Sequence, residues 1–542
     1  MRPKRVCQSA SAAMAFFVMA LSGSSASSGG ELARIPTTRE QRTLEFRSLP
    51  PVPDPPTPAG ENPIDSILAG WRKAQKTELR APVDASLFAR KIHLDLIGLL
   101  PTPGDVEVYK ARPDPAKTAD ALLGDTRGYA EHWMTFWNDL LRNDEQTSID
   151  GLRKPITPWL YRSLVENKPY DQMVEELLSP GPGGPDGYLM GVNWRGRVNL
   201  SQRPPVQAAQ NVAQVFLATS IRCASCHDGF TTPWKLKDAY GLAAFFSEGT
   251  LETARCEKPT GVFAPAKFLY DGLGDVAADA DLSTRRAAVA GMVTRPKNPR
   301  FARVLVNRLW DRLMGRALAE PIDEMTEPTC AELLDWLAYD FMGHDYDLKH
   351  TIKLIVTSKA YAQSVAEGEA VGEPNELGPV PRRLSAEQFI DAFSRLTGYW
   401  ARPAELMNIP LDGPEVRAWR HRRPSPLAVA LGRPTREQVT TKRVESATVL
   451  QALEATNGKT LGDLVSKGAE TLLASDWAKD ADAVKAANLL FLRAYSRPAS
   501  PEELAFVGPM LGHPGDPVEA RREGLEDLLW IVINSPEFQV IR

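Results

Sequence analysis

Residues 204–228 read PPVQAAQNVAQVFLATSIRCASCHD, and this stretch joins a strong helical pattern to the most specific chemical motif of the chain. Its apolar residues recur at spacings of three and four, so on a helix they share one face: Val206, Ala209, Val212, Ala213, Phe216 and Leu217. We therefore predict an amphipathic helix that leads directly into Cys223-Ala224-Ser225-Cys226-His227.

Helical spacing of apolar residues also dominates the rest of the 542-residue chain, whereas the period of two that is typical of strands is scarce. The clearest segments are residues 129–141, 171–178, 301–313, 333–341, 384–396 and 486–495. We predict a mainly α protein with two large helical domains, 64–275 and 285–542, and long Pro/Gly-rich loops. One such loop begins at PGPGGP (180–185) and runs to about residue 205.

The Cys-x-x-Cys-His spacing is the attachment signal for c-type haem. Two thiols on one turn can add to the two vinyl groups of a haem, and the adjacent histidine then faces the iron. On this interpretation Cys223 and Cys226 are the covalent anchors, and His227 is the proximal iron ligand. The predicted cofactor is one covalent haem c.

Two other uses of these residues stay open. Cys223 and Cys226 can form a disulfide with each other, or they can supply half of a zinc site, for which Cys256 is the nearest further ligand. If a haem takes Cys223 and Cys226, then Cys256 and Cys330 are left, either free or joined to each other. Four cysteines outside the leader are too few for a disulfide framework in a chain of this size.

The sixth ligand of a haem iron is less well defined by the sequence. His132 lies in the aromatic segment YAEHW (129–133) and can reach a cofactor, although a buried histidine more often bonds to the backbone. Met134 and Met190 are alternatives, but methionines on helices usually pack in the core. A vacant or water-filled position is the remaining alternative.

The N-terminus has the pattern of a secretory signal. Arg2, Lys4 and Arg5 precede an apolar run over residues 10–21, which is too short to span a membrane, and small residues follow it. We predict a signal peptide over 1–26, a proline-rich linker over 27–63, and export to the periplasm or the cell surface. No later apolar stretch is long enough for a transmembrane segment.

The net charge and the absence of several catalytic motifs argue against some classes of function. Lysine and arginine number 64 against 68 aspartates and glutamates, a net charge of −4, which argues against a nucleic-acid binder. The signatures of zinc hydrolases and serine hydrolases are absent, and GKT (458–460) lacks the earlier glycine of a P-loop because Leu453 stands there. Asp345 and Asp347 are interpreted as polar turn residues. No catalytic residue is predicted.

Residues 402–443 form a loop-like segment that is rich in positive charge. Such a segment can bind an acidic glycan or a protein partner. Alternatively, its side chains are solvated or pair with acidic residues elsewhere. The cations are Arg417, Arg420, Arg422, Arg423, Arg433, Arg436, Lys442 and Arg443.

Several motifs of the chain resemble those of a planctomycete cytochrome C-like domain of unknown function and of its usual C-terminal companion domain. The first is matched by KIHLDLIGLLPTP (91–103), NKPYD (167–171) and CASCHD (223–228). The second is matched by NPRFAR (298–303), NRLW (307–310), LLDWL (333–337), IVTS (355–358), RRLSAEQ (382–388) and INSPEF (533–538). The resemblance covers most of the chain from about residue 64.

The resemblance implies a mostly helical, exported protein with a haem site, in families without an assigned function. Two departures matter. Many members have Asp-His after the motif, whereas here Gly229 follows Asp228, so a second metal-binding histidine is missing. Many members also have cysteines before the position of Arg443, where this chain has Thr440, Thr441 and Lys442.

Three hypotheses of function follow. The first is a c-type haem protein in electron transfer or redox sensing, with a protein redox or assembly partner. The second is a non-catalytic scaffold in which the cysteines staple a loop. The third is an enzyme acting on extracellular polymers at a cleft between the Gly181–Pro205 loop and the basic segment.

Overall fold

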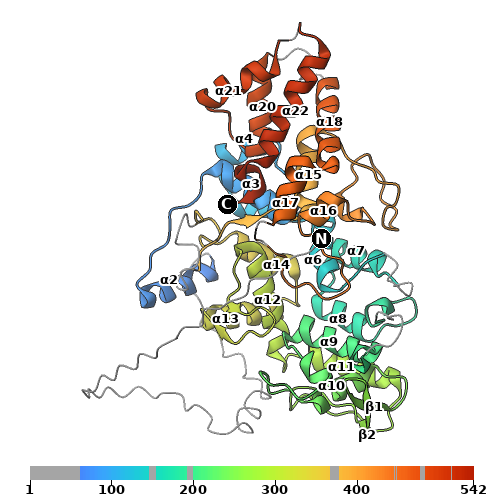
Figure 1. The fold of residues 1–542 in the computed structure, drawn as a ribbon. Coiled ribbons are helices and arrows are strands. Elements are labelled where there is room, and N and C mark those ends of the chain that lie inside the picture. Colours follow the sequence, from blue (N-terminus) through green and yellow to red (C-terminus); the bar gives the residue numbers. More distant parts are fainter. Residues whose placement is uncertain are drawn as a thin grey trace, which may run out of the picture.

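The structure is a computed structural model that describes residues 62–145, 154–191, 199–365, 377–444, 446, 448–475, 482–513 and 515–542. The predicted signal peptide and nearly all of the predicted linker lie outside the described residues. The molecule is elongated: helices α18, α20, α21 and α22 stack at one end, and α9, α10, α11 and a small hairpin lie at the other (Figure 1). No helix among the described residues is long and apolar enough to cross a bilayer.

The fold is mainly helical, as the sequence predicts. The first half of the chain contains α2 (Pro63–Gln75), α3 (Ala85–Leu96), α4 (Pro103–Ala111), α5 (Pro115–Gly124), α6 (Thr126–Leu140), α7 (Thr157–Val165), α8 (Tyr170–Leu178), α9 (Pro204–Leu217) and α10 (Leu236–Ala243). Short 3-10 turns lie between them: η1 (Asp186–Tyr188), η2 (Leu200–Gln202), η3 (Cys223–Ser225) and η4 (Ala244–Phe246).

The second half continues in the same way. Its helices are α11 (Leu282–Thr294), α12 (Pro299–Met314), α13 (Ala331–Gly343), α14 (Leu348–Val356), α15 (Ala386–Thr397), α16 (Pro426–Ala430), α17 (Val449–Asn457), α18 (Lys459–Ala474), α20 (Ala483–Tyr495), α21 (Pro501–Leu511), α22 (Val518–Asn534) and α23 (Pro536–Gln539), with the 3-10 turn η6 (Ala418–Arg420).

Strands form only three antiparallel pairs in the described part of the chain. They are β1 (Leu251–Arg255) with β2 (Lys258–Ala264), β3 (Ala319–Glu320) with β4 (Glu327–Pro328), and β5 (Arg382–Arg383) with β6 (Val540–Ile541). The sequence shows little sign of the β1–β2 hairpin because the side chains of β2 are nearly all exposed, and an exposed strand has no apolar alternation.

Side-chain caps fix several helix ends. At α15, the Ser385 hydroxyl accepts a hydrogen bond from the Gln388 N–H, and the Gln388 side chain accepts one from the Ser385 N–H. This capping box satisfies two otherwise orphaned donors at the first turn. Gly398 ends the helix with a φ of 78°, a left-handed conformation that glycine adopts without strain.

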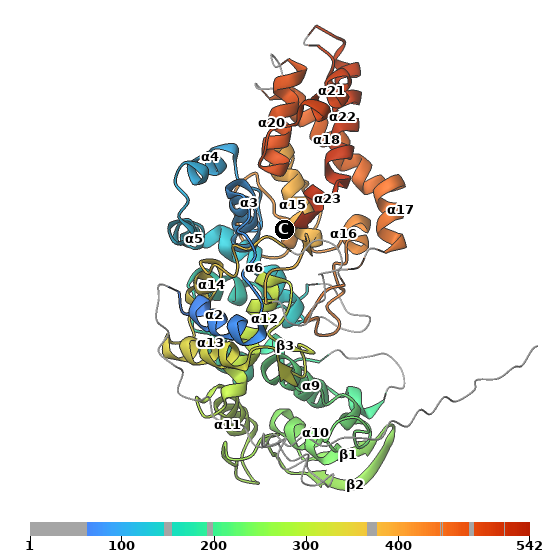
Figure 2. The ribbon, with the colours of Figure 1, turned by 90° about the vertical axis from the view of Figure 1, so that its left-hand side faces the viewer.

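The apolar interior consists of two clusters. One runs through α2–α14 and also includes Met407, Trp419 and Val439, whereas the other joins α15, α18 and α20–α23. Helix α3 contributes to both, since Ile92 packs in the first and Leu94 in the second. Figure 2 shows α3 between the α4–α5 pair and the C-terminal helices. The two clusters are thus tied together by shared elements, and segments far apart in sequence meet at their junction.

Candidate functional sites

The cysteine turn, residues Cys223–His227, follows directly from the end of α9. Ala218 takes a left-handed φ of 43° and ends that helix. Ala224 and Ser225 are buried and anchor the turn, so Cys223 is left exposed. The His227 N–H donates to the Cys223 carbonyl at 3.0 Å, which closes one helical turn. The predicted anchors and ligand therefore lie together on a single turn.

The structure brings Cys226 together with Cys256. Their Sγ atoms are 2.8 Å apart, and the Cys256 N–H donates to the Cys226 carbonyl at 3.4 Å. Cys256 lies between β1 and β2 with a φ of 54°. Asn199 Nδ2 donates to Cys226 Sγ at 3.6 Å. The four described cysteines are free thiols here, and the contact links the turn to the hairpin tip across 30 residues.

The contact between the thiols makes their acidities unequal. Burial raises the pKa of Cys226, but the hydrogen bonds from Cys256 and Asn199 outweigh it, so the pKa lies below its usual value. The same contact, together with slight burial, raises the pKa of the Cys256 thiol. Since the thiolate is the reactive form, Cys226 is the better nucleophile of the two.

His227 is half-buried, and its Nδ1 lies 2.8 Å from the carbonyl oxygen of Asp228. When Nδ1 donates this hydrogen bond, Nε2 carries the free lone pair and can bind a metal. The ring centroid lies 4.8 Å from that of Phe230, whose side chain is 87% exposed. The donor set of two thiols and one imidazole on one turn fits covalent attachment of a haem.

The other predicted ligands lie elsewhere. His132 on α6 is buried beneath Gly98 and beside Arg417, and burial holds its pKa well below the usual value. Met134 packs in the first apolar cluster, whereas Met190 is exposed. Cys330 is buried at the N-terminus of α13, whereas the exposed Cys256 lies against Cys226. Among the interactions of the described residues, Cys256 alone of this group contacts the cysteine turn, whereas His132, Met134, Met190 and Cys330 do not.

Most of the basic segment is not solvated; it forms a buried ion network. Arg443 Nε lies 2.6 Å from Asp139, and its Nη1 lies 2.6 Å from Glu387. Arg436 pairs with the same two carboxylates at 2.9 and 3.6 Å, and Arg433 pairs with Glu387 at 3.7 Å. Nearby, Arg417 pairs with Asp391. The sequence left open whether these arginines are solvated or pair with acidic residues elsewhere, and the structure shows that they pair.

The network strongly shifts the pKa values of Glu387 and Arg443. Burial raises the pKa of Glu387, but attraction from Arg443, Arg433 and Arg436 outweighs it, and the pKa falls far below the usual range. Burial lowers the pKa of Arg443, while Asp139 and Glu387 more than reverse the shift and raise it. Both partners therefore remain charged, and each depends on the other to be tolerated in the interior.

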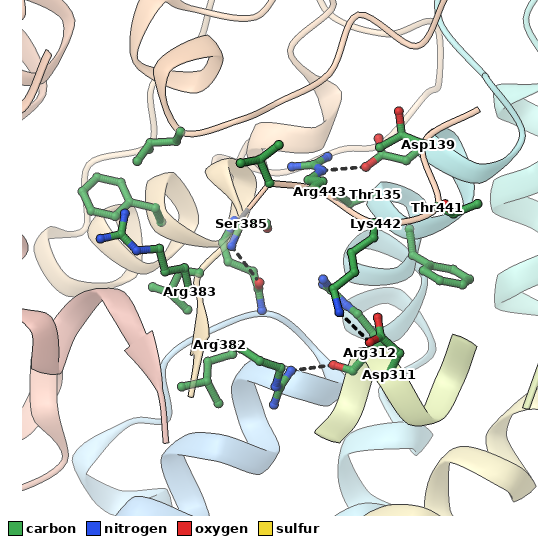
Figure 3. A pocket seen from close by; sticks show the side chains of 18 of the residues that line it. Thr135, Asp139, Asp311, Arg312, Arg382, Arg383, Ser385, Thr441, Lys442 and Arg443 are labelled. Atoms are coloured by element: carbon green, nitrogen blue, oxygen red, sulfur yellow. Dashed lines mark hydrogen bonds and ion pairs between the residues drawn. The ribbon is translucent and has the colours of Figure 1, made fainter. Parts of the chain in front are cut away.

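A cavity that we call the basic pocket lies beside this network (Figure 3). It encloses about 110 Å³, or about 1090 Å³ when its open mouth is included. Its walls come from α6, α12, β5, the start of α15 and residues 440–444. The cations that line it are Arg308, Arg312, Arg382, Arg383, Lys442 and Arg443, and the acids are Asp139 and Asp311.

A third polar cluster lies where α13 meets α14. Potential ligand atoms of Asp340, His344 and His350 lie within 4.8 Å of one another, and no other described His, Cys, Asp or Glu residues form such a group of three or more. The residues of the cysteine turn are not members of this group. Asp347 caps α14 by accepting from the His350 N–H, which agrees with its interpretation as a turn residue.

The sequence did not single out the basic pocket. Its wall residues come from positions 135 to 541, so no local motif contains them. A weak signal was available: Arg308 interrupts an otherwise apolar face of α12 that includes Val304 and Leu305. Charged residues at such positions are rarely buried unless they are paired or bind a ligand.

Two family models match the chain, in the order that its sequence motifs predict. Residues 63–250 match the model for PSCyt2, a protein of unknown function (DUF1549). Residues 285–511 match the model for PSD1, a protein of unknown function (DUF1553). No curated protein and no solved structure matches the chain. The basic pocket draws its walls from both matched regions and from the C-terminal segment after them.

Proposed function

Because the chain contains a PSCyt2 domain, which is cytochrome-C-like, followed by a PSD1 domain, we propose that it is an exported redox protein with one covalent haem c. One observation carries the proposal: Cys223, Cys226 and His227 lie on one turn, with Cys223 exposed. The predicted signal peptide supports export, since attachment of haem c takes place outside the cytoplasm.

Each residue of the turn has a distinct part in this proposal. Cys223 and Cys226 would hold the haem through thioether bonds, and His227 would bind the iron through Nε2. The Asp228 carbonyl lies 2.8 Å from Nδ1. By accepting a hydrogen bond from Nδ1 it would fix the orientation of the ring and make Nε2 a stronger ligand for the iron. A bound haem would supply one-electron exchange with another exported protein.

A second candidate function is favoured by the contact between Cys226 and Cys256. Two thiols 2.8 Å apart can form a disulfide with little movement. In that reaction both thiols lose their protons, and two electrons pass to the disulfide of an extracytoplasmic dithiol oxidase, which is thereby reduced. The protein would then be a scaffold whose motif loop is stapled to the hairpin, and Cys226 would not be available to a haem.

A pyridine haemochrome spectrum and an intact mass separate the two functions. The protein is purified from its own periplasm or from a host that matures haem c, as wild type, Cys223→Ser/Cys226→Ser, and Cys256→Ser as the matched thiol control. We expect a c-type band and the mass of one haem in wild type and Cys256→Ser, and neither in the double variant.

Folded, colourless protein would overturn the haem proposal. If its mass is two hydrogens below that of the reduced chain, and if Cys256→Ser removes this difference while Cys223→Ser keeps it, the staple is established between Cys226 and Cys256. A colourless protein with free thiols would reject both functions.

A further inference from the structure

We propose that the basic pocket binds the carboxylate or sulfate group of an acidic saccharide, and that Arg312 is the central ligand-binding residue. This inference concerns a site remote in sequence from the cysteine turn, and it does not rest on the redox function. Three observations support it: Arg312 has no direct ion pair with a described residue, the pocket has room for an oxyanion, and polar groups line its walls.

Arg312 makes no direct ion pair with a described residue, although Asp95 and Asp139 lie near enough to attract it, whereas Arg308 and Arg382 do make such pairs. Arg308 donates to the Gln214 carbonyl at 2.7 Å and to Asp323 at 3.1 Å. Arg382 makes two hydrogen bonds to Asp95, at 2.9 and 2.8 Å. The Arg312 side chain makes no hydrogen bond or ion pair with the described residues. Its guanidinium therefore lines the pocket with its donors unused.

The environment of Arg312 favours an oxyanion. Burial lowers the pKa of Arg312, and the nearby Arg382 lowers it further. A guanidinium nevertheless stays protonated at neutral pH, so it remains a cation in a partly dry site. A carboxylate or sulfate would give Arg312 a direct ion-pair partner and can bind two of its donors in the same plane.

The two acids on the pocket walls do not cancel this preference. Asp139 already pairs with Arg436 and Arg443, and Asp311 pairs with Lys442 at 2.9 Å. Figure 3 shows the Asp139–Arg443 and Asp311–Lys442 pairs on the walls, with Arg312 beside Asp311 and Lys442. The pairs also hold the walls in place, so little side-chain freedom is lost when an anion binds.

The dimensions and remaining wall residues indicate an acidic saccharide. A cavity volume of about 110 Å³ suits one oxyanion group, and the opening to solvent leaves room for the rest of a larger molecule. The hydroxyls of Thr135, Ser385 and Thr440 line the pocket and match the hydroxyls of a sugar. The side chains of Gln388, Thr441 and Gln539 also line it but already donate to protein acceptors. Phe136 and Phe389 add apolar surface for a sugar ring.

Calorimetric titration of the full mature chain tests the inference. The probes are D-glucuronate, glucose 6-sulfate and, as the uncharged control, glucose, all at constant ionic strength because screening weakens charge attraction. We expect binding of one or both acidic sugars and none of glucose. Arg312→Met should weaken binding by more than about tenfold, whereas Lys485→Ala, an exposed site with the same loss of charge, should leave it unchanged.

Folding and haem content are controlled separately. Arg312→Met should unfold at the same temperature as wild type or higher, because it removes from a partly buried site a charge that has no direct ion-pair partner among the described residues. Cys223→Ser/Cys226→Ser should bind the sugars as wild type does, so failure of the haem proposal would not affect this one. Equal binding of glucose, equal affinity in folded Arg312→Met, or no binding of either acidic sugar would overturn the inference.

Discussion

The cysteine turn and the basic pocket place chemically active groups in opposite ways. The turn gathers its groups from five consecutive residues and exposes Cys223 at the surface. The pocket gathers its groups from residues 135 to 541 and rests on a buried network around Glu387. The functional groups of the turn are neighbours in the sequence, whereas those of the pocket come together only when the chain folds.

This difference has a consequence for substitution. A change at Cys223 should alter the chemistry of the turn while leaving the fold intact, because the side chain packs against little. A change at Glu387 should destabilise the fold itself, since Arg433, Arg436 and Arg443 would lose a buried carboxylate partner. The following predictions test this contrast, beginning with the largest expected effect.

Glu387→Gln should destabilise the protein by about 3–5 kcal/mol, because Arg433, Arg436 and Arg443 lose a shared buried partner. Urea unfolding measures the change, with Glu470→Gln in an exposed pair as control. Equal stability of the two variants would contradict the account of the network. Because the folded pKa of Glu387 is depressed, its stabilisation is present above its unfolded pKa and is lost as the pH falls through the folded pKa.

Reduction of a Cys226–Cys256 disulfide should lower the unfolding temperature by roughly 5–10 °C, since the bond closes a loop of about 30 residues in the unfolded chain. Thermal unfolding with and without a reductant, in wild type and Cys256→Ser, measures the effect. An identical response of the two proteins would show that no such bond forms and would leave Cys226 to the haem.

Gly98→Ala should destabilise the protein by about 1–3 kcal/mol. Gly98 has a φ of 69°, and an added Cβ would lie 2.3 Å from His132 Nδ1. Gly70→Ala is the matched control, since Gly70 lies inside α2 with no atom near the new methyl group, and it should stabilise by about 0.5–1 kcal/mol. If Gly98→Ala were neutral, His132 would be mobile enough to serve as a ligand, contrary to its packed position.

The smallest effect concerns His350, which bonds to Asp340 Oδ2 at 2.9 Å. That hydrogen bond raises the pKa of His350, so its stabilisation is present below the unfolded pKa and is lost as the pH rises through the folded pKa. The half-exposed pair should contribute less than about 1 kcal/mol. Unfolding at about pH 5.5 and 8.5 should show a pH-dependent loss in His350→Gln. The exposed control His513→Gln should show none.

The fold class follows from sequence wherever helices are amphipathic. Periodicity predicted α6, α9, α12, α13, α15 and α20 close to their observed bounds, because one apolar face of each packs against a neighbour. It missed the β1–β2 hairpin and the contact of Cys226 with Cys256. An exposed strand carries no alternation, and a spacing of 30 residues does not specify a contact.

The sequence by itself determined the mainly helical class and the cysteine turn, because helical periodicity and a Cys-x-x-Cys-His spacing are local properties of the chain. Tertiary structure decided the rest. It turned a basic segment into a buried network with Asp139 and Glu387, and it placed Arg312 at a pocket without a direct ion pair to a described residue. Which buried charges are matched depends on long-range packing, and no local pattern encodes that.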